Sequence, residues 1–138
     1  MTHLDRLLAS RDPVGLSPLY WFSDGEGVKC GASFRSLLKD QSVPLVFSPE
    51  SLHAYLHSMW IAAPRTPVEG CHALQPGHRL LQNDETGEVR TERYWAIEEC
   101  PPIDGDPVPL IRERLLRGVE KALEGRVSIG VPLSGGID

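Results

Sequence analysis

A proline-rich segment, "CPPIDGDPVP" (100–109), limits what this chain can fold into more than any other feature of its sequence. It contains four prolines and two aspartates in ten residues. Proline has no backbone N–H and a fixed φ, so a continuous helix or central strand does not run through such a segment. We therefore predict two parts: residues 1–100 as one domain, residues 101–109 as a linker, and residues 110–138 as the start of a second domain.

Composition narrows the classes of partner that we expect. The 138 residues include 14 basic and 19 acidic side chains, for a net charge of −5, and the basic residues form no stripe. Because nucleic-acid binding depends on clustered Lys and Arg, we expect no nucleic-acid partner. The apolar runs are far shorter than the roughly 20 residues of a membrane span, so we expect no membrane partner. The first residues do not resemble a signal peptide, and we expect a cytoplasmic protein.

The cysteines and histidines form no pattern typical of a disulfide framework or a zinc site. Cys30, Cys71 and Cys100 are odd in number and widely separated, so we interpret them as buried or incidental thiols. His53 and His57 are four residues apart on a predicted helix, a spacing that can bind a metal. Without an HExxH pattern or an acidic third ligand nearby, we interpret both as structural or surface residues.

Residues 1–100 show the pattern of an α+β domain. Asp24-Gly25 and "ETGE" (85–88) each separate two strand-like runs, which predicts two β-hairpins. Ser48 suits a helix N-cap and Pro49 the first helical position, so we predict a helix there, and two helical turns over "FRSLLKD" (34–40). Apolar residues recur at helical spacing after Ser48, and we interpret this stripe as core packing: Leu52, Tyr55, Leu56 and Met59.

Residues 110–138 show the pattern of an α/β domain. "LIRERLLRGVEKALEG" (110–125) has one apolar face, and Gly125 suits the C′ position that ends a helix. "VSIGVPL" (127–133) is predicted to be a buried strand, and the glycine turn "SGGID" (134–138) follows it. Helix, strand and glycine turn in this order are typical of the opening of a parallel α/β sheet.

The glycine turn is the candidate binding site in this sequence. Ligands of open α/β sheets bind beyond the carboxyl ends of the strands. Gly135 and Gly136 allow backbone N–H groups to approach a phosphate, Ser134 offers a hydroxyl, and Asp138 offers an oxygen for Mg²⁺. Taken alone, the same residues also fit an ordinary surface turn.

Five segments in order resemble the glutamine-hydrolysing asparagine synthetase family. "SGGID" resembles the family's SGGxDS pyrophosphatase loop, and "RDPVGLSPLYW" (11–21) its Arg-Asp-x-x-Gly-x-x-Pro-Leu-Tyr segment. "ASFRSLL" (32–38) is similar to a Ser-Glu-x-x-x-Leu segment. Residues 48–81 resemble the stretch from a Tyr-Leu helix through Pro-Arg-Thr to Leu-x-Pro-Gly-His, and "RYW" (93–95) closes it. Together these matches cover nearly the whole chain.

This resemblance implies a fragment of a longer enzyme. The first part would be the end of a glutaminase domain, a partial Ntn-hydrolase β sandwich with helices, and the second the opening helix and strand of an α/β ATP-pyrophosphatase domain. The family hydrolyses glutamine and transfers the ammonia to aspartate through β-aspartyl-AMP, which implies ATP and Mg²⁺ as cofactors and glutamine, aspartate and ATP as small-molecule partners. It also allows a homodimer. The residues implied in nucleotide contact, with Asp138 also binding the metal, are Leu133, Ser134, Gly135, Gly136 and Asp138.

Several residues depart from the family pattern. The family's nucleophile is an N-terminal cysteine, which this chain lacks, so we assign no catalytic residue and expect the 138-residue chain alone to be inactive. Phe34 stands where the family usually has glutamate, and Pro132 where leucine is common. We interpret Arg11 and Asp12 as a structural ion pair at a turn rather than as catalytic residues.

Two alternatives to an asparagine synthetase fragment stay open on the sequence. One is a fragment of a ring-closing relative, of the β-lactam synthetase or lasso-peptide cyclase type, with a vestigial glutaminase half. The other is a short binding module without catalysis.

Overall fold

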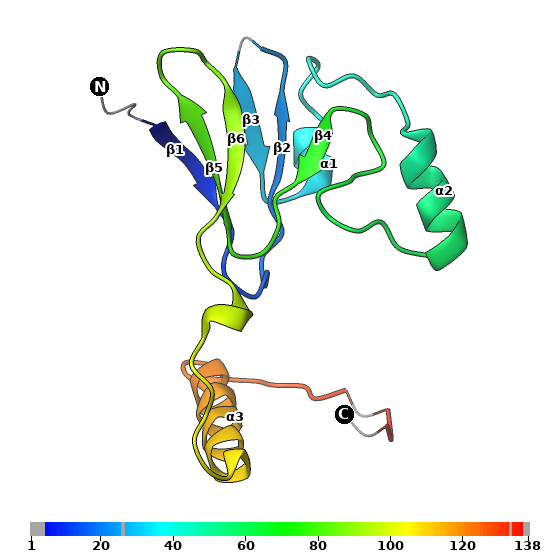
Figure 1. Ribbon diagram of the computed structural model, residues 1–138. Coiled ribbons are helices and arrows are strands. Elements are labelled where there is room, and N and C mark those ends of the chain that lie inside the picture. The colour runs from blue at the N-terminus through cyan, green and yellow to red at the C-terminus, as the bar shows by residue number, and fades with distance from the viewer. Residues whose placement is uncertain (1–4, 26, 133, 137–138) are drawn as a thin grey trace. The chain divides into compact units, whose positions relative to one another are not determined.

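The computed structural model describes residues 5–25, 27–132 and 134–136, and it divides into two compact units between Cys100 and Pro101. Within these ranges the first unit contains two antiparallel sheets and two α-helices, whereas the second contains one long helix (Figure 1). None of the helices in these described ranges is both long and apolar enough to cross a membrane. The coarse prediction of an α+β domain is therefore confirmed for the first unit.

One sheet has the strand order β1-β5-β6, formed by β1 (Asp5–Ser10), β5 (His78–Asn83) and β6 (Val89–Arg93). β5 lies between the other two strands and pairs antiparallel with both. The turn from β5 to β6 is closed by the Asn83 side chain, which accepts hydrogen bonds from the backbone N–H groups of Glu85 and Thr86, each at 2.9 Å. The hairpin predicted from "ETGE" is thus confirmed.

The other sheet has the order β3-β2-β4, formed by β2 (Tyr20–Ser23), β3 (Val28–Gly31) and β4 (Cys71–Ala73). The turn from β2 to β3 contains Gly25 at a φ of 88°, a left-handed conformation that glycine adopts without a Cβ clash. Asp24 accepts a hydrogen bond from the N–H of Gly27 at 3.0 Å across the same turn. The hairpin predicted at Asp24-Gly25 is also confirmed.

The core of the first unit lies where this second sheet meets α1 (Phe34–Leu37) and the loops around it. Buried residues from four separate segments make up the cluster: Phe22, Leu37, Val43, Val68 and Cys71. α1 has a single turn, not the two predicted, and its N-cap residue Ser33 makes no side-chain capping bond. A short 3₁₀ helix, η1 (Ile97–Glu99), ends the unit.

Helix α2 (Pro49–Ser58) forms where the sequence predicts it, but its apolar stripe does not pack into a core. Ser48 caps the helix, because its hydroxyl accepts a hydrogen bond from the N–H of Ser51 at 3.2 Å. The buried residue of α2 is Ser51, which is 1% exposed. The predicted core residues of the stripe are all at least 43% exposed: Leu52, Tyr55, Leu56 and Met59. The core-packing prediction was therefore wrong, because α2 turns its small residue toward the loops beneath it.

The second unit begins its helix earlier than predicted. α3 spans Pro107–Leu123, so it starts inside the segment assigned to the linker. The Asp106 carboxylate accepts a hydrogen bond from the N–H of Val108 at 3.0 Å and caps the helix. Pro107 and Pro109 fit its first turn, where backbone N–H groups have no partner within the helix. The helix ends before Gly125, whose φ of 69° matches the C′ position predicted for it.

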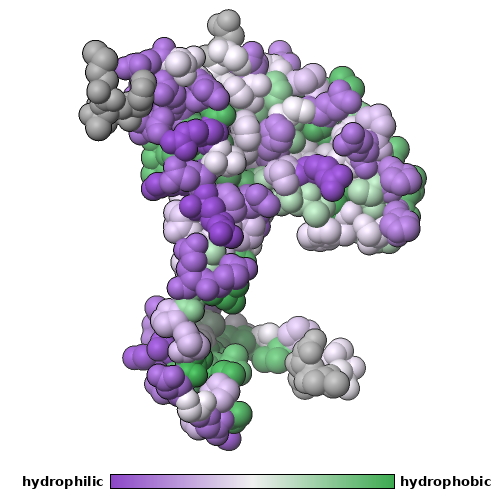
Figure 2. All heavy atoms as spheres, viewed as in Figure 1, coloured by the Kyte–Doolittle hydropathy of each residue, from purple (hydrophilic) through white to green (hydrophobic). Residues whose placement is uncertain are grey.

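The segment after α3 does not form the predicted strand. Residues 127–132 have no regular secondary structure and are exposed. A strand needs a neighbour for its hydrogen bonds, and no strand of the described ranges in this unit is available to pair with it. Hydrophilic and hydrophobic residues both lie at the surface of α3 (Figure 2). The α/β pyrophosphatase fold therefore stays a prediction.

Candidate functional site

The glycine turn is described at Ser134, Gly135 and Gly136 and lies on the surface of its unit. Gly135 has a φ of 76°, and the N–H of Gly136 donates a hydrogen bond to the Ser134 hydroxyl oxygen at 3.2 Å. A Cβ added at Gly135 would meet nothing within 4 Å, so this glycine is required by its backbone conformation rather than by crowding.

The turn fits one part of a nucleotide site. Small residues and an exposed backbone permit the close approach of a phosphate, and the Ser134 hydroxyl still has its proton to donate. The other two predicted contact residues, Leu133 and Asp138, lie outside the described residues. Within the described ranges, no group of three His, Cys, Asp or Glu residues could bind a metal ion, so nothing there adds to the Mg²⁺ assignment of Asp138.

The Arg11-Asp12 segment forms a tightly bonded loop of the first unit. Arg11 donates hydrogen bonds to the carbonyl oxygens of Ser17 (3.0 Å), Leu74 (2.6 Å) and Gly15 (3.1 Å). Asp12 accepts from the N–H groups of Leu16 (2.8 Å) and Ser17 (3.1 Å), and these bonds lower the pKa of its carboxyl group. The structural interpretation is confirmed, but the predicted ion pair is wrong: among the described residues, both side chains bond to backbone groups instead of to each other.

The Pro-Arg-Thr segment (64–66) is also built into the first unit by backbone bonds. The Thr66 hydroxyl is buried and lies 2.9 Å from the carbonyl oxygens of both Val68 and Cys71. It therefore holds the loop that leads into β4. Arg65 beside it is exposed, and its backbone N–H donates a hydrogen bond to the carbonyl oxygen of Ala62 at 3.1 Å.

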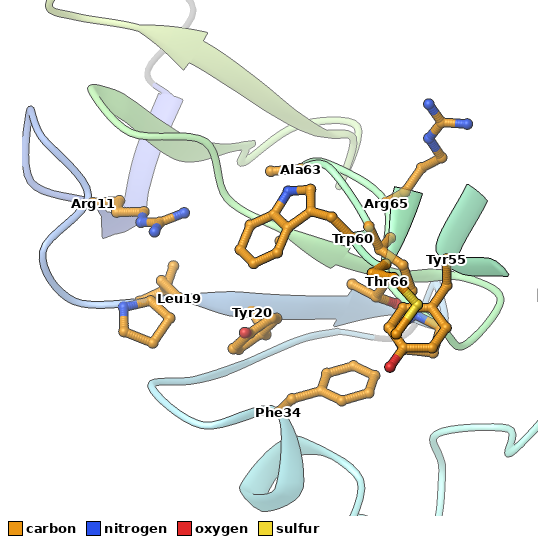
Figure 3. Close-up of a pocket in the computed structure, with 14 residues that line it drawn as sticks. Arg11, Leu19, Tyr20, Phe34, Tyr55, Trp60, Ala63, Arg65 and Thr66 are labelled. Carbon is orange, nitrogen blue, oxygen red and sulfur yellow. The ribbon is translucent and has the colours of Figure 1, made fainter. Parts of the chain in front are cut away.

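A cavity of about 430 Å³ lies between these two segments (Figure 3). Its wall combines aromatic and aliphatic side chains from β2, α1, α2 and the loop after α2. Tyr20 and Phe34 are in ring contact, with their centroids 5.2 Å apart. Figure 3 shows Arg11 directed toward the cavity from the side opposite Tyr55, with Trp60 between them. Sequence reasoning missed this cavity, because its residues come from positions far apart in the chain.

The cysteines and histidines lie as the sequence suggested. Cys71 is buried, and burial raises the pKa of its thiol, which disfavours the thiolate that a nucleophile requires. The ring of His72 stacks on that of Trp21, with centroids 4.5 Å apart. His53 and His57 on α2 are exposed, so they are surface residues.

Comparison with known proteins identifies a family model and several relatives that match this chain. A family model described as a glutamine amidotransferase domain matches residues 2–95, more than half of the chain. Among curated proteins, the chain is 28% identical to amidase chyE of Penicillium rubens, 25% to putative asparagine synthetase [glutamine-hydrolyzing] 2 of Methanocaldococcus jannaschii, and 25% to asparagine synthetase [glutamine-hydrolyzing] 1 of Bacillus subtilis.

These matches cover almost all of the chain but little of each relative. In all three cases 96% of the chain is aligned, whereas it spans 20%, 26% and 21% of the respective relatives. The expected resemblance to glutamine-hydrolysing asparagine synthetases is therefore confirmed.

Proposed function

Because the chain belongs to the glutamine amidotransferase domain family, we propose that the protein containing it uses ammonia from glutamine to convert aspartate to asparagine at the expense of ATP. One observation carries this proposal. The family model ends at residue 95, but the alignments to asparagine synthetases extend over 96% of the chain and so continue into the second unit. The likeness thus includes both units.

The residues of the glycine turn have a defined part in this proposal. Ser134, Gly135 and Gly136 would hold a phosphate of ATP through hydroxyl and backbone N–H groups, and Leu133 and Asp138 are proposed beside them, with Asp138 binding Mg²⁺. When bound, ATP supplies the activation that makes a carboxylate reactive toward ammonia. Glutamine and aspartate are the proposed small-molecule partners, and a homodimer is the proposed assembly.

A second candidate follows from the relatives themselves. Two of them, from Penicillium rubens and Gibberella zeae, bear the name amidase, at 28% and 27% identity. A chain of this family could therefore serve a different amide reaction, in which aspartate is not the acceptor. The two candidates differ in whether product formation requires aspartate.

The native protein that contains this segment is the material for the test. It can be isolated from its source cells with an antibody against the exposed turn 84–88, and its mass and N-terminal residue measured. With amide-¹⁵N glutamine, aspartate, ATP and Mg²⁺, we expect ¹⁵N-labelled asparagine together with equal amounts of AMP and pyrophosphate. The purified 138-residue chain serves as the control and should give none of these three products.

The outcomes separate the candidates. Labelled asparagine that depends on both aspartate and ATP supports the proposal. Glutamine hydrolysis or amide formation that is unchanged when aspartate is omitted would overturn it in favour of the amidase candidate. A native protein without an N-terminal cysteine that consumes ATP but not glutamine would favour the ring-closing relatives.

A further inference from the structure

The cavity of the first unit combines an apolar wall with unbalanced positive charge. Its lining is mostly aromatic and aliphatic: Leu19, Tyr20, Phe34, Tyr55, Met59 and Trp60. Among the described residues of the lining, Arg11 and Arg65 are the charged ones, and none is acidic. An apolar pocket with a few convergent polar groups is typical of sites for small organic molecules.

Among the described residues, no acidic side chain forms an ion pair with Arg11. A guanidinium group has five N–H donors, and three of them are used by the carbonyl oxygens of Gly15, Ser17 and Leu74. Two donors remain, and no ion pair between described residues includes Arg11. The half-buried side chain is held firmly by these bonds, so the guanidinium is already in position for an anion.

The remaining walls suit a flat apolar body. Tyr20 and Phe34 form one wall through their ring contact, and Tyr55, Met59 and Trp60 also line the cavity. Trp60 is 71% exposed and Met59 70%, which is a large apolar area to leave in water without a ligand. Figure 3 shows the guanidinium of Arg65 directed away from the rings, so Arg65 adds positive charge at the rim rather than inside.

We propose that this cavity binds a small aromatic carboxylate, with the ring system between Tyr20, Phe34 and Trp60 and the carboxylate on Arg11. A volume of about 430 Å³ is within the range of roughly 300–1,000 Å³ that ligand pockets occupy. This inference is independent of the ATP-dependent reaction proposed above. All residues that line the cavity belong to the first unit.

A matched pair of probes tests the carboxylate. Binding of 2-naphthoate and of its neutral analogue 2-naphthamide to the purified chain is measured by ligand-detected NMR and isothermal titration. We expect the acid to bind about tenfold or more tightly than the amide at low salt, as for hydrogen bonds to a charged partner. We also expect this ratio to fall as the salt concentration rises, because added ions screen the attraction between the carboxylate and the positive charge of the cavity.

Variants identify the residues. Arg11→Gln should reduce the acid-to-amide ratio to about one, and Trp60→Ala should weaken the acid and the amide alike by about tenfold. Arg35→Gln is the control, because Arg35 is an exposed arginine of α1 that does not line the cavity, and it should leave both affinities unchanged. Circular dichroism of each variant checks the fold.

Two results would overturn the proposal. One is equal affinity for acid and amide in the unaltered chain, and the other is binding that Trp60→Ala leaves intact. Because both readouts avoid changes at Arg11, they decide the matter even if Arg11→Gln fails to fold. Neither depends on glutamine or ATP, so failure here leaves the asparagine synthetase proposal untouched.

Discussion

Replacing Gly77 by alanine tests how the Pro76-Gly77 turn supports the first unit. Gly77 is buried with a φ of 67°, and a Cβ there would lie 2.6 Å from the carbonyl oxygen of Trp95. Its own carbonyl accepts hydrogen bonds from the N–H groups of Tyr94 (2.8 Å) and Trp95 (3.2 Å). The offending atom is backbone, so relief of the contact must disturb these two bonds.

The expected cost has two parts. A left-handed φ costs a residue with a Cβ about 1–2 kcal/mol relative to glycine, and overpacking against rigid atoms adds about 1–3 kcal/mol. Gly87 provides the matched control, because its φ is 73° but an added Cβ would meet nothing within 4 Å. Gly87→Ala should therefore show the first cost alone, about 1–2 kcal/mol, and Gly77→Ala about 2–5 kcal/mol.

Urea unfolding followed by tryptophan fluorescence measures both variants. Trp21, Trp60 and Trp95 are the three tryptophans of the chain, and all lie in the first unit, so the signal reports on that unit. For a domain of this size each kcal/mol corresponds to about 4–8 °C in melting temperature, which gives an independent check. If Gly77→Ala and Gly87→Ala destabilise the chain equally, the steric argument at Trp95 is wrong.

Three further changes probe other contacts of the first unit. Ser48→Ala should cost about 1 kcal/mol of unfolding free energy in urea, since it removes the α2 cap, whereas Ser33→Ala, at an N-cap without a side-chain bond, should cost nearly nothing. The hydrogen bond from Lys29 lowers the pKa of the Asp40 carboxyl to about 2. The unaltered chain should therefore be more stable than Asp40→Asn above about pH 4, and this difference should vanish as the pH falls through about 2. A difference that stays constant with pH would contradict this. Burial lowers the pKa of His72 below its ordinary value of 6.5, because the charged imidazolium is poorly solvated there. Acidification below that pH should therefore lower the stability of the unaltered chain more than that of His72→Gln. Tryptophan fluorescence measures both proteins.

Contacts between near neighbours in the sequence were largely predictable. The turn at Asp24-Gly25 depends on a glycine φ and a bond from Gly27 three residues away. The α2 cap likewise joins Ser48 to Ser51. Such features follow from the residues themselves, because few alternative partners lie within reach of a short segment.

Burial was not predictable in the same way. The stripe of α2 has the spacing of a buried face, yet Leu56 is 72% exposed and Ser51 is the buried residue. The apolar run 127–132 has the composition of a buried strand, yet it makes no ladder in the structure. In both cases the spacing is compatible with burial, but burial requires a second surface, and a local pattern contains no information about that surface.

The sequence by itself determined the hairpins, the α2 cap at Ser48, the C′ glycine of α3, the glycine turn and the family to which the chain belongs. Only the tertiary structure decided that Arg11 and a set of aromatic residues line one cavity. Arg11 bonds to Leu74, 63 positions away, and its carbonyl accepts a hydrogen bond from the Tyr94 hydroxyl at 2.7 Å, 83 positions away. Contacts of this kind depend on how distant segments pack together. The cavity beside Arg11 therefore forms only once the chain has folded.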